Sequence, residues 1–460
     1  MRTGRGADRL PASFRDPAGF LFMQNGVLYR QINRAYQEQY ARLSDSGLYG
    51  KLVGAGLLVR HEESDQPPLN AEAAFKVIRP ELVPFISYPF EWSFSQLKDA
   101  ALLTLAIQKQ AMQHGMTLKD ASAYNIQFSQ GKPVLIDTLS FDLYDEGKPW
   151  EAYRKFCQHF LAPLALMAYL DVRLGQLSRD YLDGIPLDLT GKLLPFRTKG
   201  NLGLFTHIHL HAATQNRYAG RPVRHTLRMS STALTGLIEN LEKFVRYLSW
   251  RPTGTDWGDY YDRTNYSGPA LENKKALVRE WTGTVSPALI FDLGAKTGLF
   301  SRESASSGAM VVAVDLDPAA VEQNYQTVKR NGEKRILPLL LDLNNPTPQF
   351  GWNLSERDSF HHRGPADLVL ALALVHHLAI SNNIPLPYFA EFLAEQCRWL
   401  IVEFVPKTDS QVQKLLASRK DIFPTYSKEG FESAFAGFFE TIRAERLGDS
   451  DRTLYFMKRL

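Results

Sequence analysis

The second half of the chain alternates short apolar runs with amphipathic stretches, and this alternation constrains the fold more than any other feature. The apolar runs have the length and residue types of buried strands, and the stretches between them have helical spacing. The expected strands are 288–293, 310–314, 336–341, 366–374 and 399–405, and the expected helices are 271–282, 297–306, 318–331 and 388–395. This order predicts a parallel sheet with helices on both faces.

The last segment departs from this alternation. Two strand-like runs, 438–447 and 452–460, are joined by a short polar turn that begins with Gly448. Such a pattern is typical of a hairpin. The predicted fold class of this half is therefore α/β, with a Rossmann-like seven-stranded sheet that ends in a hairpin.

The first expected strand runs into a glycine turn, in which Gly294 and Gly298 let a ligand approach bare backbone. Asp292 lies in this strand, Asp315 ends the second strand, and Asp342 follows the third. An acid in the position of Asp315 can accept hydrogen bonds from a ribose, and Asp342 can accept from an adenine amino group. Because the carboxyl ends of parallel strands meet at one edge, the three acids predict a nucleotide-like site there.

These features resemble the class I S-adenosylmethionine-dependent methyltransferases over nearly all of residues 271–460. The matching motifs are Asp292-x-Gly-x-x-x-Gly298, Val314-Asp-x-Asp317, Leu341-Asp-Leu343, Asp367-Leu-Val-Leu370 and Leu400-Ile-Val-Glu403, closed by the terminal hairpin. The resemblance implies S-adenosylmethionine as cofactor, with its methionine part at the turn, its ribose at Asp315 and its adenine at Asp342. The implied cofactor-binding residues are Asp292, Gly294, Lys296, Gly298, Asp315 and Asp342. Lys296 stands where the family commonly has a third glycine-turn residue, which bears on how the cofactor carboxylate is held.

A second set of motifs narrows the resemblance. These are Asn344-Asn-Pro346, Gly351-Trp-Asn353, the run from Ser355 to Phe360, the run from Ala371 to Leu378, Asn383-Ile-Pro385 and the run from Val402 to Pro406. They are similar to those of a group of methyltransferase-like proteins that includes host-specificity nodulation proteins. A dehydrogenase is the nearest alternative, and the terminal hairpin and the missing Gly-x-Gly-x-x-Gly fingerprint count against it.

Methyl transfer is an in-line displacement at a sulfonium methyl, so the protein must align the acceptor and, for a hydroxyl, remove its proton. His376 and His377 follow the fourth strand at the predicted ligand edge, and histidine titrates near neutral pH. One of them is a candidate base or orienting group; alternatively, the pair caps the next loop or packs the pocket. Glu403, which ends the fifth strand, is another candidate base, with a structural hydrogen bond as its alternative role. Glu356 and Arg357 are expected to form a local salt bridge, or else to border the adenine.

The first 150 residues predict an α+β module of a different kind. Asp120 is followed five residues later by Asn125, and Asp137 ends the next hairpin. Protein-kinase-like folds place a catalytic base and two magnesium ligands in this pattern. Residues 74–170 therefore resemble a kinase-like C-lobe, with Asp120, Asn125 and Asp137 as a possible second site and Lys76 as the candidate phosphate-pairing lysine.

This resemblance has clear departures. No glycine-rich phosphate loop is evident in residues 1–73, the segment before Asp120 lacks the usual histidine, and Thr138-Leu139 replaces the Phe-Gly that would follow the second Asp. The alternative is a hairpin with an Asx-type turn at Asp120 that supports substrate binding.

Coarser patterns complete the N-terminal half and give the domain boundaries. A polar helix is expected near 35–43, a short strand at the end of 51–60, a strand at 74–79, a helix at 93–115, a loop at 180–197 and a helix at 231–248. The expected domains are an α+β kinase-like module at 1–150, a mainly helical subdomain at 151–255 and the methyltransferase domain at 256–460.

Composition narrows the partners. The 460 residues carry a net charge of +4 without a concentrated basic stripe, so no nucleic-acid partner is predicted. Cys157 and Cys397 lie far apart and outside any metal-ligand spacing, which favours a reducing, cytoplasmic location. The longest apolar run, 160–170, is shorter than the roughly 20 residues of a membrane span. His207, His209 and His211 also fit a helix, which would scatter their rings, so no metal site is predicted.

The sequence thus predicts an S-adenosylmethionine-dependent methyltransferase that acts on a hydroxyl of a small molecule or glycan, with the N-terminal module docking the substrate. The alternatives are a bifunctional kinase and methyltransferase, and a non-catalytic cofactor-binding protein. The sequence predicts neither the identity of the acceptor nor the oligomeric state.

Overall fold

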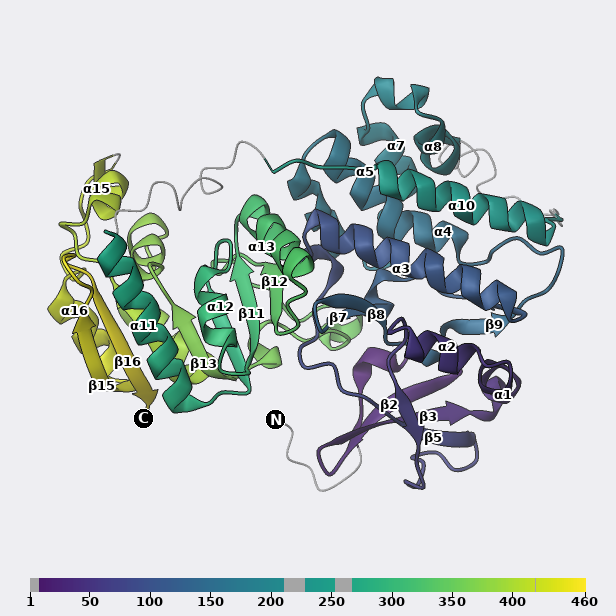
Figure 1. Ribbon diagram of the computed structural model, residues 1–460, viewed down its shortest axis with the longest axis horizontal. Coiled ribbons are helices and arrows are strands. Elements are labelled where there is room, and N and C mark those ends of the chain that lie inside the picture. The colour runs from purple at the N-terminus through teal and green to yellow at the C-terminus, as the bar shows by residue number, and fades with distance from the viewer. Residues whose placement is uncertain (1–7, 211–227, 253–266, 418) are drawn as a thin grey trace. The chain divides into compact units, whose positions relative to one another are not determined.

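The chain folds into two compact units (Figure 1). The structure is a computed structural model that describes residues 8–210, 228–252, 267–417 and 419–460. The first unit is Met1–Arg251 together with Gln349–Arg357, and the second is Pro252–Pro348 together with Asp358–Leu460. The ranges predicted as a kinase-like module and a helical subdomain therefore share one unit, and the boundary predicted at residue 255 lies outside the described residues.

A five-stranded antiparallel sheet opens the first unit. Its strands are β1 (Asp8–Arg9), β2 (Gly19–Gln24), β3 (Val27–Asn33), β4 (His61–Glu63) and β5 (Ala74–Pro80), in the order β1-β2-β3-β5-β4. Helices α1 (Gln37–Asp45) and α2 (Leu48–Gly54) lie between β3 and β4 along the chain. The buried cluster that joins these elements contains Ala18, Ile32, Tyr36, Tyr40, Ile78 and Leu139.

The strand predicted at the end of residues 51–60 is wrong, since helix α2 covers much of this range. Leu48 and Leu52 are both fully buried, which is the spacing of one helical face rather than the alternation of a strand. Gly47, with φ of 77°, forms the left-handed junction from which the helix begins. The expected helix near 35–43 and the expected strand at 74–79 are confirmed as α1 and β5.

The rest of the first unit is organised around helix α3 (Phe94–Gln113), which starts with a capping box between Ser93 and Gln96. Strands β7 (Ile126–Ser129) and β8 (Lys132–Leu135) form the predicted hairpin, and β6 (Met116–Leu118) pairs with β9 (Phe141–Leu143). The later helices are α4 (Tyr153–Phe156), α5 (Ala162–Tyr169), α6 (Leu177–Asp180), α7 (Leu187–Leu193), α8 (Leu202–Leu204) and α10 (Ser231–Tyr247). Helix α7 corrects the loop predicted at 180–197, because Leu187 and Thr190 lie one helical turn apart and are both buried.

A seven-stranded sheet forms the second unit, as predicted. Its strands are β10 (Leu289–Leu293), β11 (Met310–Asp315), β12 (Ile336–Leu340), β13 (Ala366–Ala371), β14 (Cys397–Phe404), β15 (Phe439–Arg446) and β16 (Thr453–Arg459). The order is β12-β11-β10-β13-β14-β16-β15, with the first five parallel and the terminal hairpin antiparallel. The chain starts at β10 in the middle, builds one side and then the other, so the switch point where doubly wound sheets bind ligands lies between β10 and β13.

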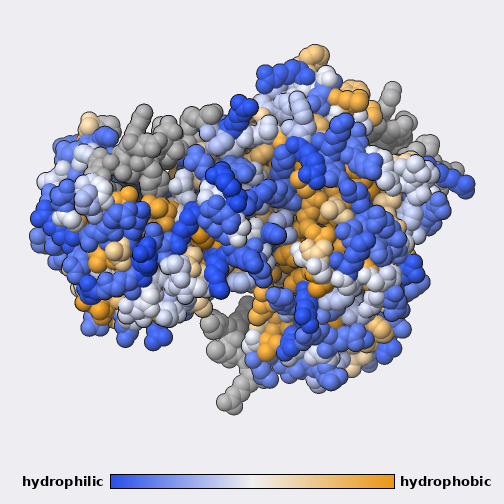
Figure 2. Space-filling model, in the orientation of Figure 1, coloured by the Kyte–Doolittle hydropathy of each residue, from blue (hydrophilic) through white to orange (hydrophobic). Residues whose placement is uncertain are grey.

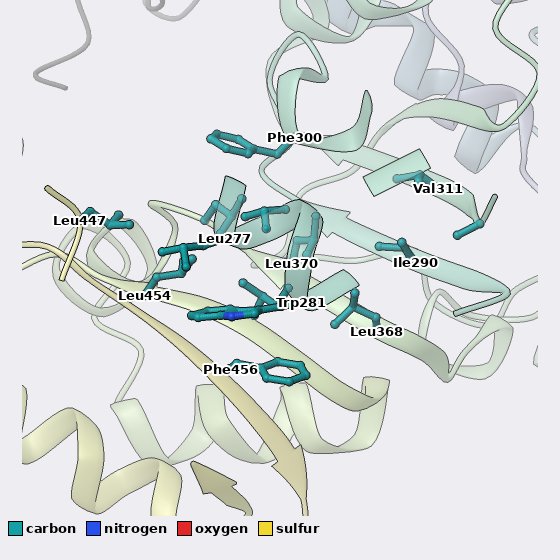
Figure 3. Close-up of a cluster of buried hydrophobic side chains, with 14 residues drawn as sticks. Leu277, Trp281, Ile290, Phe300, Val311, Leu368, Leu370, Leu447, Leu454 and Phe456 are labelled. Atoms are coloured by element: carbon teal, nitrogen blue, oxygen red, sulfur yellow. The ribbon is translucent and has the colours of Figure 1, made fainter. Parts of the chain in front are cut away.

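Six helices accompany this sheet in the described part of the second unit. They are α11 (Gly268–Val285), α12 (Leu299–Ala305), α13 (Pro318–Asn331), α14 (Leu386–Gln396), α15 (Ser410–Ala417) and α16 (Lys428–Ala436). Figure 3 shows the apolar core between α11 and the strands, where Trp281 stacks on Phe456 with ring centroids 5.5 Å apart. Burial of a large side chain of this kind stabilises the fold by about 1.5–3 kcal/mol.

The outer surface is largely hydrophilic, with scattered apolar patches (Figure 2). Exposed large apolar side chains include Phe196, Leu202 and Tyr388. In the ranges that the structure describes, no helix combines the length and the apolar character that crossing a bilayer demands.

Candidate cofactor and active site

The turn between β10 and α12 brings bare backbone to the carboxyl edge of the sheet. Gly294 and Gly298 have φ of 76° and 83°, in the left-handed region that favours glycine. A Cβ on Gly298 would lie 2.4 Å from Oδ1 of Asn324, so no larger residue fits there. Lys296 also has a positive φ, 51°, although this conformation costs a non-glycine residue about 1–2 kcal/mol.

Asp292 and Asp315 lie on the neighbouring strands β10 and β11. Asp292 is buried and accepts a hydrogen bond of 2.6 Å from the Ser301 hydroxyl, and burial raises the pKa of Asp292 to about 6. Asp315 accepts from the backbone N–H groups of Lys296 at 2.7 Å and Asp317 at 2.9 Å, and burial raises its pKa as well. The Asp315 carboxylate is thus fixed beside the glycine turn.

Asp342 follows β12, the next strand of the sheet. One oxygen of its carboxylate accepts from the backbone N–H of Asn344 at 2.8 Å and from the Asn344 side-chain amide at 3.0 Å. The structure therefore places Asp292, Asp315 and Asp342 on or just after three adjacent parallel strands.

The Lys296 side chain lies in the same region. Burial lowers the pKa of Lys296 to about 7, although the negative charge of Asp315 opposes the shift. An ammonium group with such a pKa exchanges its proton readily near neutral pH.

His376 and His377 follow β13 at this edge, with ring centroids 4.1 Å apart. His376 is fully buried, and within the described ranges neither of its ring nitrogens has a hydrogen-bond partner. Burial lowers the pKa of both imidazoles, that of His377 to about 4, and the positive charges of Lys296 and Arg452 lower both further. Both rings are therefore neutral at pH 7.

Glu403 is enclosed by cations. Nζ of Lys274 lies 2.5 Å from Oε2 of Glu403, and a terminal guanidinium nitrogen of Arg452 lies 3.5 Å from Oε1. Arg452 also forms an ion pair of 2.8 Å with Asp409. The side chains of Lys274, Glu403 and Arg452 are all at most 2% exposed. Glu403 therefore connects α11, β14 and the residue before β16, with its charge already balanced by the protein.

Sequence reasoning missed Lys274 and Arg452. Lys274 shares the buried face of α11 with Ala270, Leu277 and Trp281 at helical spacing, and a lysine on such an apolar stripe is the signal that could have found it. Arg452 follows the hairpin turn without any local pattern that distinguishes it from an exposed arginine.

The predicted local salt bridge between Glu356 and Arg357 is wrong. Glu356 is buried and instead accepts two hydrogen bonds from Arg15, of 2.5 and 3.0 Å. The guanidinium of Arg357 lies over the ring of Tyr124, with 5.2 Å between its central carbon and the ring centroid. Long-range partners thus replace the neighbour that the sequence suggested.

Phe350, in the same segment, packs against an aromatic cluster of the first unit. Its ring centroid lies 5.1 Å from that of Tyr88, 5.6 Å from that of Phe90 and 6.3 Å from that of Tyr124. Residues 349–357 accordingly count with the first unit, although the residues on both sides of them belong to the second.

The residues of the possible second site are linked by hydrogen bonds within the first unit. The Asn125 side-chain amide donates to Asp120 at 3.3 Å and to the Ser140 hydroxyl at 3.2 Å, and that hydroxyl donates to Asp137. Asp120 also accepts from the backbone N–H of Ser122 at 2.9 Å, which is the Asx-type turn considered above.

The cation beside Asp137 is Arg30 rather than Lys76. A guanidinium nitrogen of Arg30 lies 2.5 Å from Asp137, and another lies 3.2 Å from Asp16. Burial alone would raise the pKa of Asp137, but Arg30 and the hydrogen bonds to this carboxylate outweigh burial and hold the pKa below its ordinary value. Lys76 instead forms an ion pair of 2.6 Å with Glu63.

His207 and His209 lie in a helical turn and bond to other side chains. The His207 ring contacts the Tyr153 hydroxyl at 2.7 Å and the Asn240 carbonyl oxygen at 2.9 Å, and His209 contacts the Thr198 hydroxyl at 3.0 Å. His211 lies outside the described residues.

The sheet order, the glycine turn after β10 and the acids at the ends of β10, β11 and β12 together define a methyltransferase-like α/β protein. No family model matches the chain. Among curated proteins, nodulation protein NoeA from Rhizobium meliloti (strain 1021) is 34% identical to it over 461 residues, which is 98% of this chain and 96% of the relative. The chain therefore belongs to the NoeA family.

Two solved structures are similar to part of the chain. N-methyltransferase NodS from Bradyrhizobium japonicum WM9, in complex with S-adenosyl-l-homocysteine, is 12% identical with a TM-score of 0.33, covering 45% of this chain and 93% of that one. Magnesium protoporphyrin IX methyltransferase (ChlM) from Synechocystis PCC 6803, with bound SAH, is 19% identical with a TM-score of 0.31, covering 44% and 94%. Both scores are low, and the likeness takes in less than half of this chain.

Removal of the Glu403 carboxylate would leave Lys274 without its buried counter-ion. Glu403→Ala is therefore expected to lower the free energy of unfolding by about 3–5 kcal/mol, measured by urea denaturation. The double variant Lys274→Met/Glu403→Leu should recover part of this loss, because Arg452 keeps Asp409. As a control, Glu280→Ala breaks an exposed ion pair with Arg443 and should cost less than about 1 kcal/mol. Equal effects of Glu403→Ala and Glu280→Ala would contradict a buried network.

Proposed function

We propose that the second unit is an S-adenosylmethionine-dependent methyltransferase and that its acceptor is a hydroxyl of a small molecule or glycan. The observation that carries this proposal is the set of three acids on or just after adjacent parallel strands, next to a turn whose glycines expose backbone. The relative is described as a nodulation protein, which supports a role for this chain in nodulation as well.

The residues at the carboxyl edge suit this cofactor. The turn from Gly294 to Gly298 would face its methionine part, Asp315 would accept from the ribose hydroxyls, and Asp342 would accept from the adenine amino group. Lys296 and Asp292 would complete the set beside the turn. When bound, the cofactor supplies an electrophilic methyl group on a sulfonium.

A test of fit comes from His376. A buried imidazole without hydrogen bonds costs about 1–3 kcal/mol for each unsatisfied group, and native proteins rarely leave such groups unpaired. A polar ligand that reached this ring would supply the missing partner, so the unpaired nitrogens support a ligand site beside β13. His376 and His377, both neutral, would orient the acceptor, and Glu403 would hold the surrounding elements in place.

The first unit is proposed to be kinase-related and to dock the substrate. The antiparallel order β1-β2-β3-β5-β4, the long helix α3 and the hairpin between Asn125 and Asp137 support the kinship. Arg30 would take the place of the phosphate-pairing lysine, because it holds Asp137 directly. A bifunctional kinase and methyltransferase is the second candidate function, supported by the linked set Asp120, Asn125 and Asp137.

Calorimetry with S-adenosylhomocysteine tests the cofactor assignment. Asp315→Ala is expected to weaken binding by about 1–3 kcal/mol, the scale of a lost buried hydrogen bond. Asp367 is a matched control, because it lies at the amino end of β13 and accepts from the backbone of Ala288 and Leu289, and Asp367→Asn should bind normally. Unchanged affinity in Asp315→Ala would remove the ribose assignment.

Thermal unfolding with magnesium and ATP tests the second candidate function. If the first unit binds nucleotide, the melting temperature should rise by about 2 °C or more, and Asp137→Asn should abolish the rise measured from its own baseline. Asp142→Asn, which alters a nearby carboxylate bonded to Gln39 at 3.2 Å, should keep it. If the wild-type chain shows no rise, the first unit is a docking module without nucleotide.

The acceptor itself can be sought with radiolabelled S-adenosylmethionine. The purified chain is incubated with fractions of a cell extract, and the hydroxyl proposal predicts label in a low-molecular-weight or glycan fraction. If every fraction stays blank while calorimetry shows cofactor binding, the non-catalytic alternative is favoured.

A further inference from the structure

Lys296 occupies a position where a lysine is conformationally unfavourable. Its φ of 51° lies in the left-handed region, between two glycines that also have positive φ. The backbone N–H of Lys296 donates to Asp315 at 2.7 Å, which fixes the residue at the carboxyl edge of β10 and β11. Strain of this kind persists where the surrounding structure enforces it, and it concentrates at functional sites.

The groups that the sequence suggested as bases are poorly placed to take a proton. Glu403 is held by Lys274 at 2.5 Å and by Arg452 at 3.5 Å, both fully buried, so protonation of its carboxylate would leave these cations uncompensated. His376 and His377 are buried beside three positive charges, and each would have to become a further cation there.

Lys296 differs from these groups because it accepts a proton next to a carboxylate. Asp315 lies against the backbone of the same residue, and its negative charge favours the ammonium form of the side chain. The electrostatic influence of Lys296 on both His376 and His377 places its side chain near the imidazole pair after β13. Lys296 thus connects the cofactor side of the edge to the side where the acceptor would lie.

We propose that Lys296 is the catalytic base of the methyl transfer and removes the proton of the acceptor. This inference rests on the proposed methyltransferase function and adds a residue role to it. The neutral amine of Lys296 takes the proton from the acceptor hydroxyl as the acceptor oxygen forms its bond to the methyl carbon. The sulfur–methyl bond breaks with its electron pair on sulfur, which leaves neutral S-adenosylhomocysteine, a methyl ether and the Lys296 ammonium. The ammonium then returns its proton to water.

The acidity of the candidates agrees with this assignment. A general base works best when its pKa lies near the working pH. Burial brings the pKa of Lys296 to about 7, whereas it takes that of His377 to about 4. At pH 7 a large share of Lys296 is therefore an unprotonated amine.

Several charged groups face Lys296 from the surrounding elements. They are Asp315 on β11, Lys274 on α11, Glu403 on β14, Arg452 before β16, and His376 and His377 after β13. Asp292 on β10 also matters, because its pKa of about 6 lies within the range in which Lys296 changes charge.

The ratio of S-adenosylmethionine affinity to S-adenosylhomocysteine affinity tests the proposal without an acceptor. The two ligands differ by the methyl group and its sulfonium charge, which a protonated Lys296 repels and a neutral amine does not. As pH rises from 6 to 8.5 and Lys296 loses its proton, the ratio is expected to rise about tenfold, the effect of one pKa unit of coupling. Calorimetry of both ligands across this range gives the ratio.

Two substitutions isolate the lysine. Lys296→Met should give a high ratio with little dependence on pH, and Lys296→Arg should give a low ratio, because the guanidinium keeps its charge throughout. Lys275→Met, which removes a neighbouring lysine bonded to Glu272 at 2.7 Å, should follow the wild-type curve. If Lys296→Met does not fold, the arginine variant still separates a fixed charge from one that titrates.

Three results would overturn the inference. A ratio independent of pH in the wild-type chain, with both ligands bound, would show that the ammonium does not face the sulfonium and would leave the proposed function intact. A pH dependence retained in full by Lys296→Met would assign the effect to another group such as Asp292. Failure of the wild-type chain to bind either ligand would remove the proposed function and this inference together.

Discussion

The structure of the second unit depends on the fact that parallel strands deliver their carboxyl ends to a single edge. In this chain the residues at those ends are charged, and the covering helices and loops bury most of them. Charges buried together must be paired. Lys274 and Arg452 meet this requirement for Glu403, and Ser301 and backbone N–H groups meet part of it for Asp292 and Asp315. The helix before the sheet and the hairpin after it are thereby tied to the same edge.

The first unit solves a similar problem with one arginine. Arg30 leaves the middle of a sheet and lies between two carboxylates, Asp16 and Asp137. A guanidinium suits this position better than a lysine, since its planar group offers several donors to two partners at once. Asp137 is consequently a hub that joins the sheet to the hydrogen-bonded set around Asn125 and Ser140.

Periodicity in the sequence predicts the second unit well, because each strand and helix there is defined by its own residues. The seven strands and the terminal hairpin follow from local patterns, and so does the placement of Asp292, Asp315 and Asp342. Pairing across long distances is not encoded locally. Glu356 has Arg357 as its neighbour but bonds to Arg15, and Lys76 looked suitable for a site in which Arg30 in fact stands. Helix α2 was misread for a related reason, since a short run with several apolar residues fits either periodicity.

The segment 349–357 gives the chain a discontinuous architecture. The second unit cannot be cut out as one uninterrupted stretch, because a fragment beginning near residue 252 would carry this segment away from the aromatic cluster and from Arg15. The first unit expressed alone would lack Phe350 and Glu356 and would expose the surface that they cover. Neither half is therefore a free-standing module, and a family built in this way is expected to gain or lose its two units together during evolution.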